Sequence, residues 1–154
     1  MAEVLSPREV FLKLVYGVCE GREEEVLGLY AEQTHVEHPF HPLEAPPLRS
    51  VEELRAHFGV RSPAGAPAGH TLLRRPAGIV VHETADPEVI VAEFRYEGTV
   101  AETGEAFAFP GIFVMRVRDG KIVESRDYLD HLRSARARGQ LGEVLDAVRE
   151  HHTA

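Results

Sequence analysis

The chain has 154 residues, a length that favours a single folded domain over residues 1–154. Its 25 acidic and 17 basic residues give a net charge of −8, which argues against nucleic acid as a partner. No apolar run reaches the roughly 20 residues of a membrane-spanning helix, so we expect no membrane partner. Cys19 is the single cysteine, which excludes an internal disulfide bond and favours a cytoplasmic location.

Helical patterns dominate the first part of the chain. Residues 6–9 combine a capping serine, a proline and a glutamate, and the apolar residues that follow at helical spacing predict a helix that ends at Gly21. A shorter helix is expected over residues 23–31 and a brief strand over 34–38. A second capping motif predicts a third helix over residues 50–58.

Strand patterns dominate after a predicted loop of Gly, Pro and small residues at 62–69. The strands are expected at residues 71–75, 79–83, 88–100, 105–118 and 121–130. Thr-Gly and Asp-Gly pairs separate the last three, as is typical of hairpins. Helices followed by a strand meander predict an α+β fold with a core over about residues 6–130 and a helical tail over 131–154.

One acidic residue stands out in the last predicted strand. Because side chains alternate between the faces of a strand, Asp127 shares a face with Val123, Ser125 and Leu129. A carboxylate among apolar neighbours needs a partner, has a raised pKa or takes part in a reaction. Asp127 is therefore a candidate catalytic residue. The alternative is a structural acid bonded to a backbone donor or an arginine.

Alternation also assigns faces in the two preceding strands. The faces expected to line a concavity with Asp127 carry Ile90, Ala92, Phe94 and Tyr96 in one strand and Ala108, Pro110, Ile112 and Val114 in the next. Phe113 and Met115 would then lie on the outer face of the sheet. Since two large apolar side chains rarely stay exposed in a monomer, they predict a homodimer formed through that face.

The order of elements and the segments 21–32, 36–39 and 120–130 resemble the SnoaL-like branch of the nuclear transport factor 2-like superfamily. The resemblance extends from Val10 to about Asp130. It implies a cone-shaped, mostly antiparallel sheet wrapped around N-terminal helices, as in the cystatin-like folds. Ketosteroid isomerase, limonene epoxide hydrolase and polyketide cyclases share this fold with binding proteins and transport adaptors, so the fold alone does not define an activity.

Two of these activities conflict with the residues present. The oxyanion-hole donors of ketosteroid isomerase fall on Leu14 and Ile112, which cannot donate a hydrogen bond from their side chains. The arginine and second aspartate of limonene epoxide hydrolase fall near Phe94 and Tyr96. The resemblance therefore implies neither enolate stabilisation of the isomerase type nor epoxide hydrolysis by an Asp-Arg-Asp arrangement.

Two other positions favour acid–base chemistry. His38 falls on the position of the isomerase's catalytic aspartate, and Asp127 resembles the aspartate base on the last strand of polyketide cyclases. Imidazole and carboxylate groups are the usual carriers of protons near neutral pH. Although His35 and His41 lie close to His38 in sequence, their spacing within a proline-interrupted segment does not suit a metal site, and we expect no metal.

The sequence therefore predicts a small-molecule enzyme that acts by general acid–base catalysis on an apolar or polycyclic substrate, without a cofactor. The reaction would be an isomerisation, cyclisation, elimination or hydrolysis, with Asp127 as base and His38 as its partner or as the acid. The residues expected to bind the substrate are Leu14, Tyr16, Phe40, Phe58, Phe94, Tyr96, Ile112, Val114 and Ser125. The alternative is a non-catalytic small-molecule-binding or protein-interaction module with the same fold.

Overall fold

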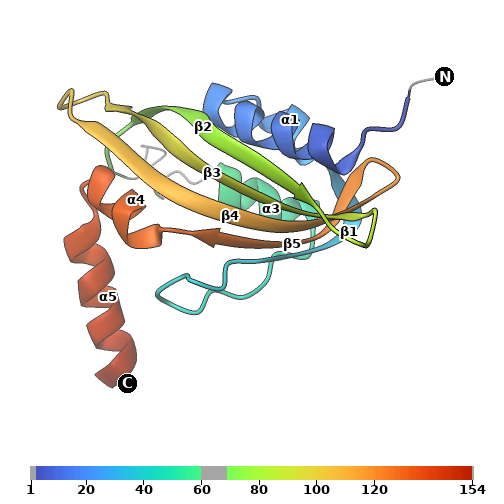
Figure 1. Ribbon diagram of the computed structural model, residues 1–154. Helices are drawn as coiled ribbons and strands as arrows, with labels where there is room; N and C mark the ends of the chain where they lie inside the picture. The colour runs from blue at the N-terminus through green and yellow to red at the C-terminus, as the bar shows by residue number, and fades with distance from the viewer. Residues whose placement is uncertain (1–2, 60–68, 154) are drawn as a thin grey trace.

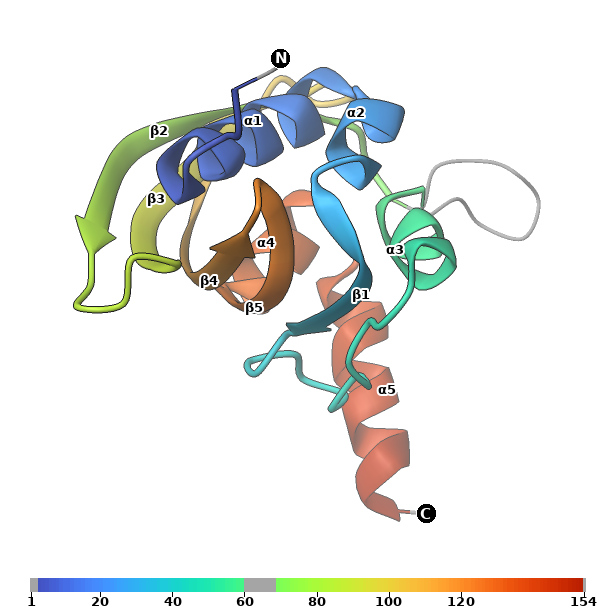
Figure 2. The same ribbon diagram turned by 90° about the vertical axis from the view of Figure 1, so that its right-hand side faces the viewer.

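The computed structural model describes residues 3–59 and 69–153, so the predicted loop lies outside the described residues except for Gly69. The predicted α+β fold is confirmed: a curved five-stranded sheet has helices packed on its inner face (Figures 1 and 2). The strands are β1 (Tyr30–Glu37), β2 (Leu72–Glu83), β3 (Val89–Val100), β4 (Ala106–Arg118) and β5 (Lys121–Leu129). Their order in the sheet is β1-β5-β4-β3-β2. Only the β1–β5 pair is parallel among these neighbours.

The first helix, α1 (Pro7–Glu20), begins and ends where its capping residues predict. Ser6 and Glu9 form a reciprocal capping box, and Gly21 closes the helix with a left-handed φ of 70°. The apolar side of α1 packs on the sheet, with the ring of Phe11 centred 6.0 Å from that of Phe113 on β4. This contact forms the middle of the core and leaves the C-terminal half of α1 beside a cavity.

The second helix is shorter than the sequence pattern predicts. α2 (Glu23–Leu27) ends before Tyr30, which instead begins β1. The backbone N–H of Ile122 donates a hydrogen bond to the carbonyl oxygen of Leu29 at 2.8 Å. From this point the chain pairs with β5 instead of continuing as a helix. The third helix, α3 (Val51–Phe58), starts at its predicted Ser50 cap and closes the side of the molecule next to β1 (Figure 2).

The inner and outer faces of β4 are the reverse of those predicted. Phe113 is paired with Asp127 in the sheet, and directly opposite residues project from the same face. Phe113 and Met115 are buried, whereas Ile112 is 40% exposed on the outer face. The predicted outward exposure of Phe113 and Met115 is therefore wrong. The homodimer loses this support and stays a prediction.

The two strands predicted at residues 71–75 and 79–83 form one continuous strand, β2. An irregularity between Ala77 and Val80 interrupts its pairing with β3, and Gly78 has a left-handed φ of 61° at that point. The chain therefore bends without leaving the sheet.

The C-terminal tail forms two helices rather than one. α4 (His131–Ala137) and α5 (Leu141–Thr153) are separated by a turn in which Gly139 has a φ of 72°. α4 packs near the sheet, whereas α5 projects away from the body of the molecule in both views (Figures 1 and 2). Among the described residues, none of the helices is long and apolar enough to cross a membrane.

Candidate functional site

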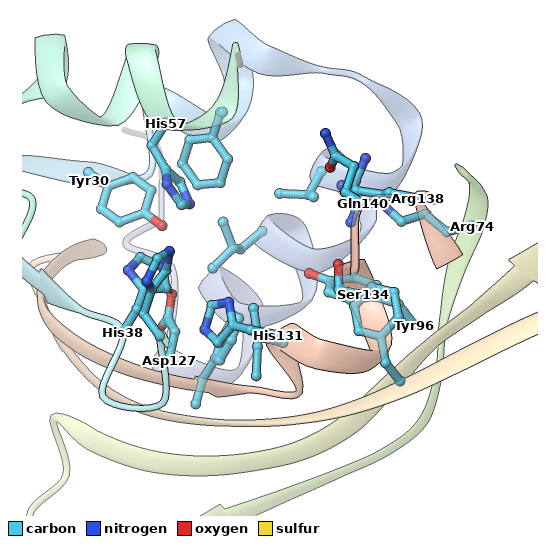
Figure 3. Close-up of a pocket in the computed structure, with 17 residues that line it drawn as sticks. Tyr30, His38, His57, Arg74, Tyr96, Asp127, His131, Ser134, Arg138 and Gln140 are labelled. Carbon is cyan, nitrogen blue, oxygen red and sulfur yellow. Dashed lines mark ion pairs between the residues drawn. The ribbon is translucent and has the colours of Figure 1, made fainter. Parts of the chain in front are cut away.

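A cavity of about 540 Å³ lies between the inner face of the sheet and the helices α1, α3 and α4 (Figure 3). It is lined by Leu14, Val18, Tyr30, His38, His41, His57, Phe58, Arg74, Tyr96, Phe109, Phe113, Asp127, Leu129, His131, Ser134, Arg138 and Gln140. Every strand and three helices contribute, so the cavity exists only in the complete fold. Its size lies within the range of about 300–1,000 Å³ that is typical of small-molecule sites.

Asp127 lies at the buried end of this cavity and is 6% exposed. The hydroxyl group of Ser125, two residues earlier on the same face of β5, donates a hydrogen bond to Oδ1 of Asp127. Burial raises the pKa of Asp127 to about 7, although the bond from Ser125 acts in the opposite direction. A carboxyl group with a pKa near neutrality can take up a proton from a substrate and return it.

His38 lies beside Asp127, as the sequence predicts. Its Nε2 atom is 3.8 Å from Oδ2 of Asp127, and its side chain is 6% exposed. Burial lowers the pKa of His38 to about 3, and the neighbouring imidazoles of His57, His131 and His41 lower it further. At neutral pH the imidazole is therefore uncharged, and its distance from Asp127 exceeds that of a direct hydrogen bond.

Three further histidines complete a cluster around His38. The ring centres of His38 and His57 are 4.8 Å apart, and those of His41 and His131 are 5.1 Å apart. Burial lowers the pKa of His131 to about 4, and its buried Nε2 atom has no hydrogen-bond partner within the described protein. An unpartnered polar atom in a cavity wall is costly unless a ligand or water contacts it.

The histidine cluster does not have the arrangement of a metal site. Among the residues that the structure describes, no group of three or more His, Cys, Asp or Glu side chains could hold a metal ion. His35 lies outside the cluster because its Nε2 atom is 2.8 Å from Oε1 of Glu37 on the same strand. Of the three histidines that are close in sequence, His38 and His41 therefore join the cluster and His35 does not.

Tyr30 is a cavity residue that the sequence does not identify. Burial raises the pKa of its hydroxyl well above the ordinary value, and the charge of Asp127 adds to this effect. Figure 3 shows this hydroxyl directed toward the side of the cavity that holds His38 and Asp127. Burial likewise raises the pKa of Tyr96, which lies on β3. Both hydroxyls stay protonated at neutral pH and can donate hydrogen bonds to a bound molecule.

The structure brings several predicted residues to the cavity. Leu14 and Phe58 form part of its apolar wall, and Tyr96 lines it from β3. Ser125 lies behind Asp127 and contacts its carboxylate rather than the open space. The roles of these residues in binding and catalysis stay predictions.

Five of the predicted binding residues lie elsewhere, and their assignment to the cavity is wrong. Phe94 is in the core, 4% exposed, with its ring centre 4.9 Å from that of Phe113. Tyr16 is 42% exposed on α1 and does not line the cavity. Phe40 and Ile112 line a separate groove of about 390 Å³ on the outside of the sheet. Val114 shares the outward face of β4 with Ile112 because the two are separated by one residue.

A group of polar residues at the other end of the cavity is also absent from the sequence prediction. Arg74 lies on β2, with the carbon of its guanidinium group 4.9 Å from the centre of the Tyr96 ring. Arg138 and Gln140 come from the turn between α4 and α5, and Ser134 comes from α4. The cavity thus combines a carboxyl group and imidazoles at one end with two arginines at the other (Figure 3).

Known proteins share this sequence pattern and this fold. The family model described as a SnoaL-like domain matches residues 13–125. A presumed isomerase from Bacillus subtilis is 26% identical and superposes with a TM-score of 0.72, covering 87% of this chain and 93% of its own. A presumed polyketide cyclase from Xanthomonas campestris pv. campestris is 16% identical, with a TM-score of 0.64 over 85% of this chain and 95% of its own, and shows similarity of fold alone.

A curated relative matches a shorter segment. An uncharacterised PhzA/B-like protein from Pseudomonas aeruginosa is 40% identical over 58 residues, or 38% of this chain. The chain spans 41% of the length of that relative.

Proposed function

The chain belongs to the SnoaL-like domain family, and on this basis we propose that it is a cofactor-independent small-molecule enzyme that acts by general acid–base catalysis. The proposed reaction is an isomerisation or cyclisation that begins with removal of a proton next to a carbonyl group. The observation that carries this proposal is Asp127, a buried carboxyl group with a pKa of about 7 in the wall of a cavity. The cytoplasmic location stays a prediction from the single cysteine.

The proposed first step uses the carboxylate of Asp127 as the base. It takes a proton from the carbon next to the carbonyl group, and the electron pair of the broken C–H bond forms a carbon–carbon double bond. The carbonyl π electrons move to the oxygen, which becomes an enolate. The Tyr30 hydroxyl is well placed to donate a hydrogen bond to this oxygen, because it stays protonated and lies on the Asp127 side of the cavity.

The second step depends on the substrate. In an isomerisation, the substrate carries a carbon–carbon double bond beside the carbon that loses the proton, so the enolate is conjugated, and the protonated Asp127 returns its proton to the far carbon of that double bond. In a cyclisation, the enolate carbon attacks a second carbonyl group of the same molecule, a carbon–carbon bond forms, and Asp127 gives its proton to the new alkoxide. The neutral imidazole of His38 beside Asp127 can contact the substrate in either case without competing for the proton, since its pKa is about 3.

The names of the similar structures agree with this reaction class. One is described as an isomerase and another as a polyketide cyclase, although both descriptions are presumptive. The alternative of a non-catalytic binding module is favoured by Leu14, Phe94 and Ile112, whose side chains cannot donate hydrogen bonds. Tyr30, Tyr96 and His131 supply polar groups in the cavity, which removes that objection to catalysis.

A probe reaction can test Asp127 as a base before the substrate is identified. The ring opening of 5-nitrobenzisoxazole needs only a base: the proton leaves C3, the N–O bond breaks, and a coloured phenolate forms. We expect the protein to accelerate this reaction, with a rate that rises with pH around a midpoint near 7 as Asp127 ionises. Asp127→Asn should lower the acceleration by at least about 100-fold.

The control is Glu124→Gln, which removes an exposed carboxylate from the other face of β5. Its rate should equal that of the unchanged protein, and circular dichroism should show that both variants are folded. Equal rates for the unchanged protein and a folded Asp127→Asn variant would rule out Asp127 as the base and favour the binding module.

We also propose that the protein forms a homodimer through the outer face of the sheet. The support comes from apolar side chains on that face: Leu73 and Val80 on β2 are 58% and 49% exposed, and Ile112 on β4 is 40% exposed. The outer groove, lined by residues that include Phe40, Pro110 and Ile112, lies on the same side of the sheet as Ile112.

A further inference from the structure

Two arginines lie together at one end of the cavity, opposite the end that holds Asp127. Figure 3 shows Arg74, Arg138 and Gln140 gathered there, with His38 and Asp127 on the far side. Arg74 comes from β2 and Arg138 from the turn after α4, so segments far apart in sequence build this group. Both arginines are half-buried and line the cavity wall.

Neither guanidinium group has a carboxylate partner within residues 3–59 and 69–153. Several surface arginines do have such a partner: Arg75, the next residue on β2, lies 3.0 Å from Glu97, and Arg116 lies 2.8 Å from Asp86. The chain has eight more acidic than basic residues, so carboxylates are plentiful. Two unneutralised arginines in a cavity of an acidic protein therefore indicate a site for an anion from outside the chain.

The two like charges also oppose each other. Burial lowers the pKa of Arg138, and the charge of Arg74 lowers it further. Like charges that are held close together are unfavourable, and an anion bound between them would remove this repulsion. The free protein thus carries an electrostatic cost that a bound anion offsets.

The Arg74 side chain and the backbone that carries Arg138 are held in place by their surroundings. The guanidinium of Arg74 lies over the ring of Tyr96, at a distance that gives a cation–π contact. The carbonyl oxygen of Arg138 accepts a hydrogen bond from the backbone N–H of His70 at 2.9 Å, which ties the turn to the start of β2. Groups that are ordered before binding lose little conformational entropy when a ligand arrives.

We propose that this end of the cavity binds the carboxylate group of the substrate. The planar guanidinium groups of Arg74 and Arg138 match a carboxylate, and the Gln140 amide can donate a further hydrogen bond. The apolar part of the molecule would lie against Leu14 and Phe109 between the two ends. The substrate is then an amphiphilic organic acid with its reacting carbon at Asp127, and only this last point rests on the proposed function.

The test compares 1-naphthylacetate with 1-naphthylacetamide, a neutral molecule of nearly the same shape. The chain contains no tryptophan, so the fluorescence of the naphthalene ring reports binding directly. We expect the acid to bind at least about 10-fold more tightly than the amide, as charge-assisted hydrogen bonds imply. In Arg74→Gln and Arg138→Gln this preference should fall close to one, and Arg138→Lys should restore part of it.

Two matched controls keep the net charge change the same. Arg75→Gln alters the neighbouring residue on the opposite face of β2, and Arg136→Gln alters an exposed arginine on α4. Both should keep the preference for the acid. Equal affinity for acid and amide in the unchanged protein would overturn the proposal, as would a preference that survives both cavity variants. Tighter binding of 1-naphthyl phosphate than of the acid would overturn the assignment to a carboxylate.

The outcome is separable from that of the proposed function. Asp127→Asn should keep the preference for the acid, because Asp127 lies at the other end of the cavity. The benzisoxazole reaction uses a neutral molecule and does not depend on the arginines. A failed acid–amide comparison therefore leaves Asp127 as the base, and a failed benzisoxazole test leaves the anion site.

Discussion

At the residue scale, the chemistry of the site depends on a balance at Asp127. Burial raises the pKa of its carboxyl group, and the hydrogen bond from Ser125 lowers it. Burial dominates, so the group titrates near neutral pH rather than near its ordinary value of about 3.9. A weaker burial effect would leave a permanently ionised carboxylate and a poorer base. Without the hydrogen bond from Ser125, the pKa of the Asp127 carboxyl group would be higher, and the group would be mostly protonated at neutral pH.

This balance predicts the effect of Ser125→Ala. Removing the hydroxyl donor takes away a bond that favours the ionised carboxylate, so the pKa of Asp127 should rise above about 7. The midpoint of the benzisoxazole pH–rate profile should move upward by about one pH unit, the equivalent of one ordinary hydrogen bond. Ser134→Ala, which removes a cavity hydroxyl from α4, should leave the midpoint unchanged. A downward shift in Ser125→Ala would contradict this account.

The sequence identifies Asp127 and His38 because strand alternation and the family resemblance act at single positions. It does not identify His57, His131 or Arg138, which reach the cavity from α3, α4 and the turn after α4. Each of these residues is an ordinary polar side chain of a helix or turn in the sequence pattern. These side chains meet in the cavity because of the way those elements pack against one another. The spacing of residues along the chain does not predict how elements far apart in sequence pack.

At the element scale, β4 shows why alternation alone can fail. Its two faces are both apolar over most of the strand, so the pattern does not say which face is buried. The pattern that shows which face is buried lies at the C-terminal end of the strand, where Arg116 and Arg118 alternate with the buried Met115 and Val117. Because arginines favour water, this alternation assigns Ile112 to the outer face and Phe113 to the inner face.

The outer face of β4 predicts how the homodimer can be disrupted. Ile112 is exposed in the middle of that face and beside the outer groove, so Ile112→Lys should place two charges within an apolar interface. We expect the unchanged protein to sediment as a dimer at micromolar concentrations and Ile112→Lys as a folded monomer. Leu145→Lys on the projecting α5 helix is the control and should stay dimeric. A monomeric unchanged protein would reject the proposed dimer.

The tail illustrates a second limit of sequence patterns. The sequence predicts that the tail is helical, but one glycine determines where the helix is interrupted and in which direction its second part runs. Gly139, with a φ of 72°, turns the chain between α4 and α5, and a Cβ atom there would lie 2.8 Å from the ring of His70. The turn directs Arg138 and Gln140 into the cavity wall and α5 away from it.

At the scale of the whole molecule, the order of helices and strands is enough to predict the α+β class, because few layered arrangements can bury these apolar faces. The histidine cluster belongs to the same scale. His38 and His41 follow β1, His57 lies in the last turn of α3 and His131 begins α4, so the cluster forms only when all these elements are in place. Its protonation is therefore coupled to folding as a whole.

This coupling predicts sensitivity to acid. In the folded protein the pKa of His38 is lowered to about 3 and that of His131 to about 4, whereas unfolded histidines titrate near 6.5. As the pH falls below about 6.5, the unfolded chain takes up protons that the folded protein cannot, so stability is lost. Asp127 acts in the opposite direction, since with a pKa of about 7 it keeps one proton in the folded state that the unfolded chain releases.

On unfolding, His38 and His131 together take up two protons and Asp127 releases one, so the unfolded chain binds one proton more than the folded protein. The free energy of unfolding should therefore fall by about 1.4 kcal/mol per pH unit between roughly pH 6 and 5. His41 and His57, whose pKa values are also lowered, add to this loss. Urea unfolding followed by circular dichroism at several pH values measures the slope. His131→Gln removes one imidazole of the cluster and should flatten the slope. A slope that His131→Gln leaves unchanged would mean that other groups control the acid response.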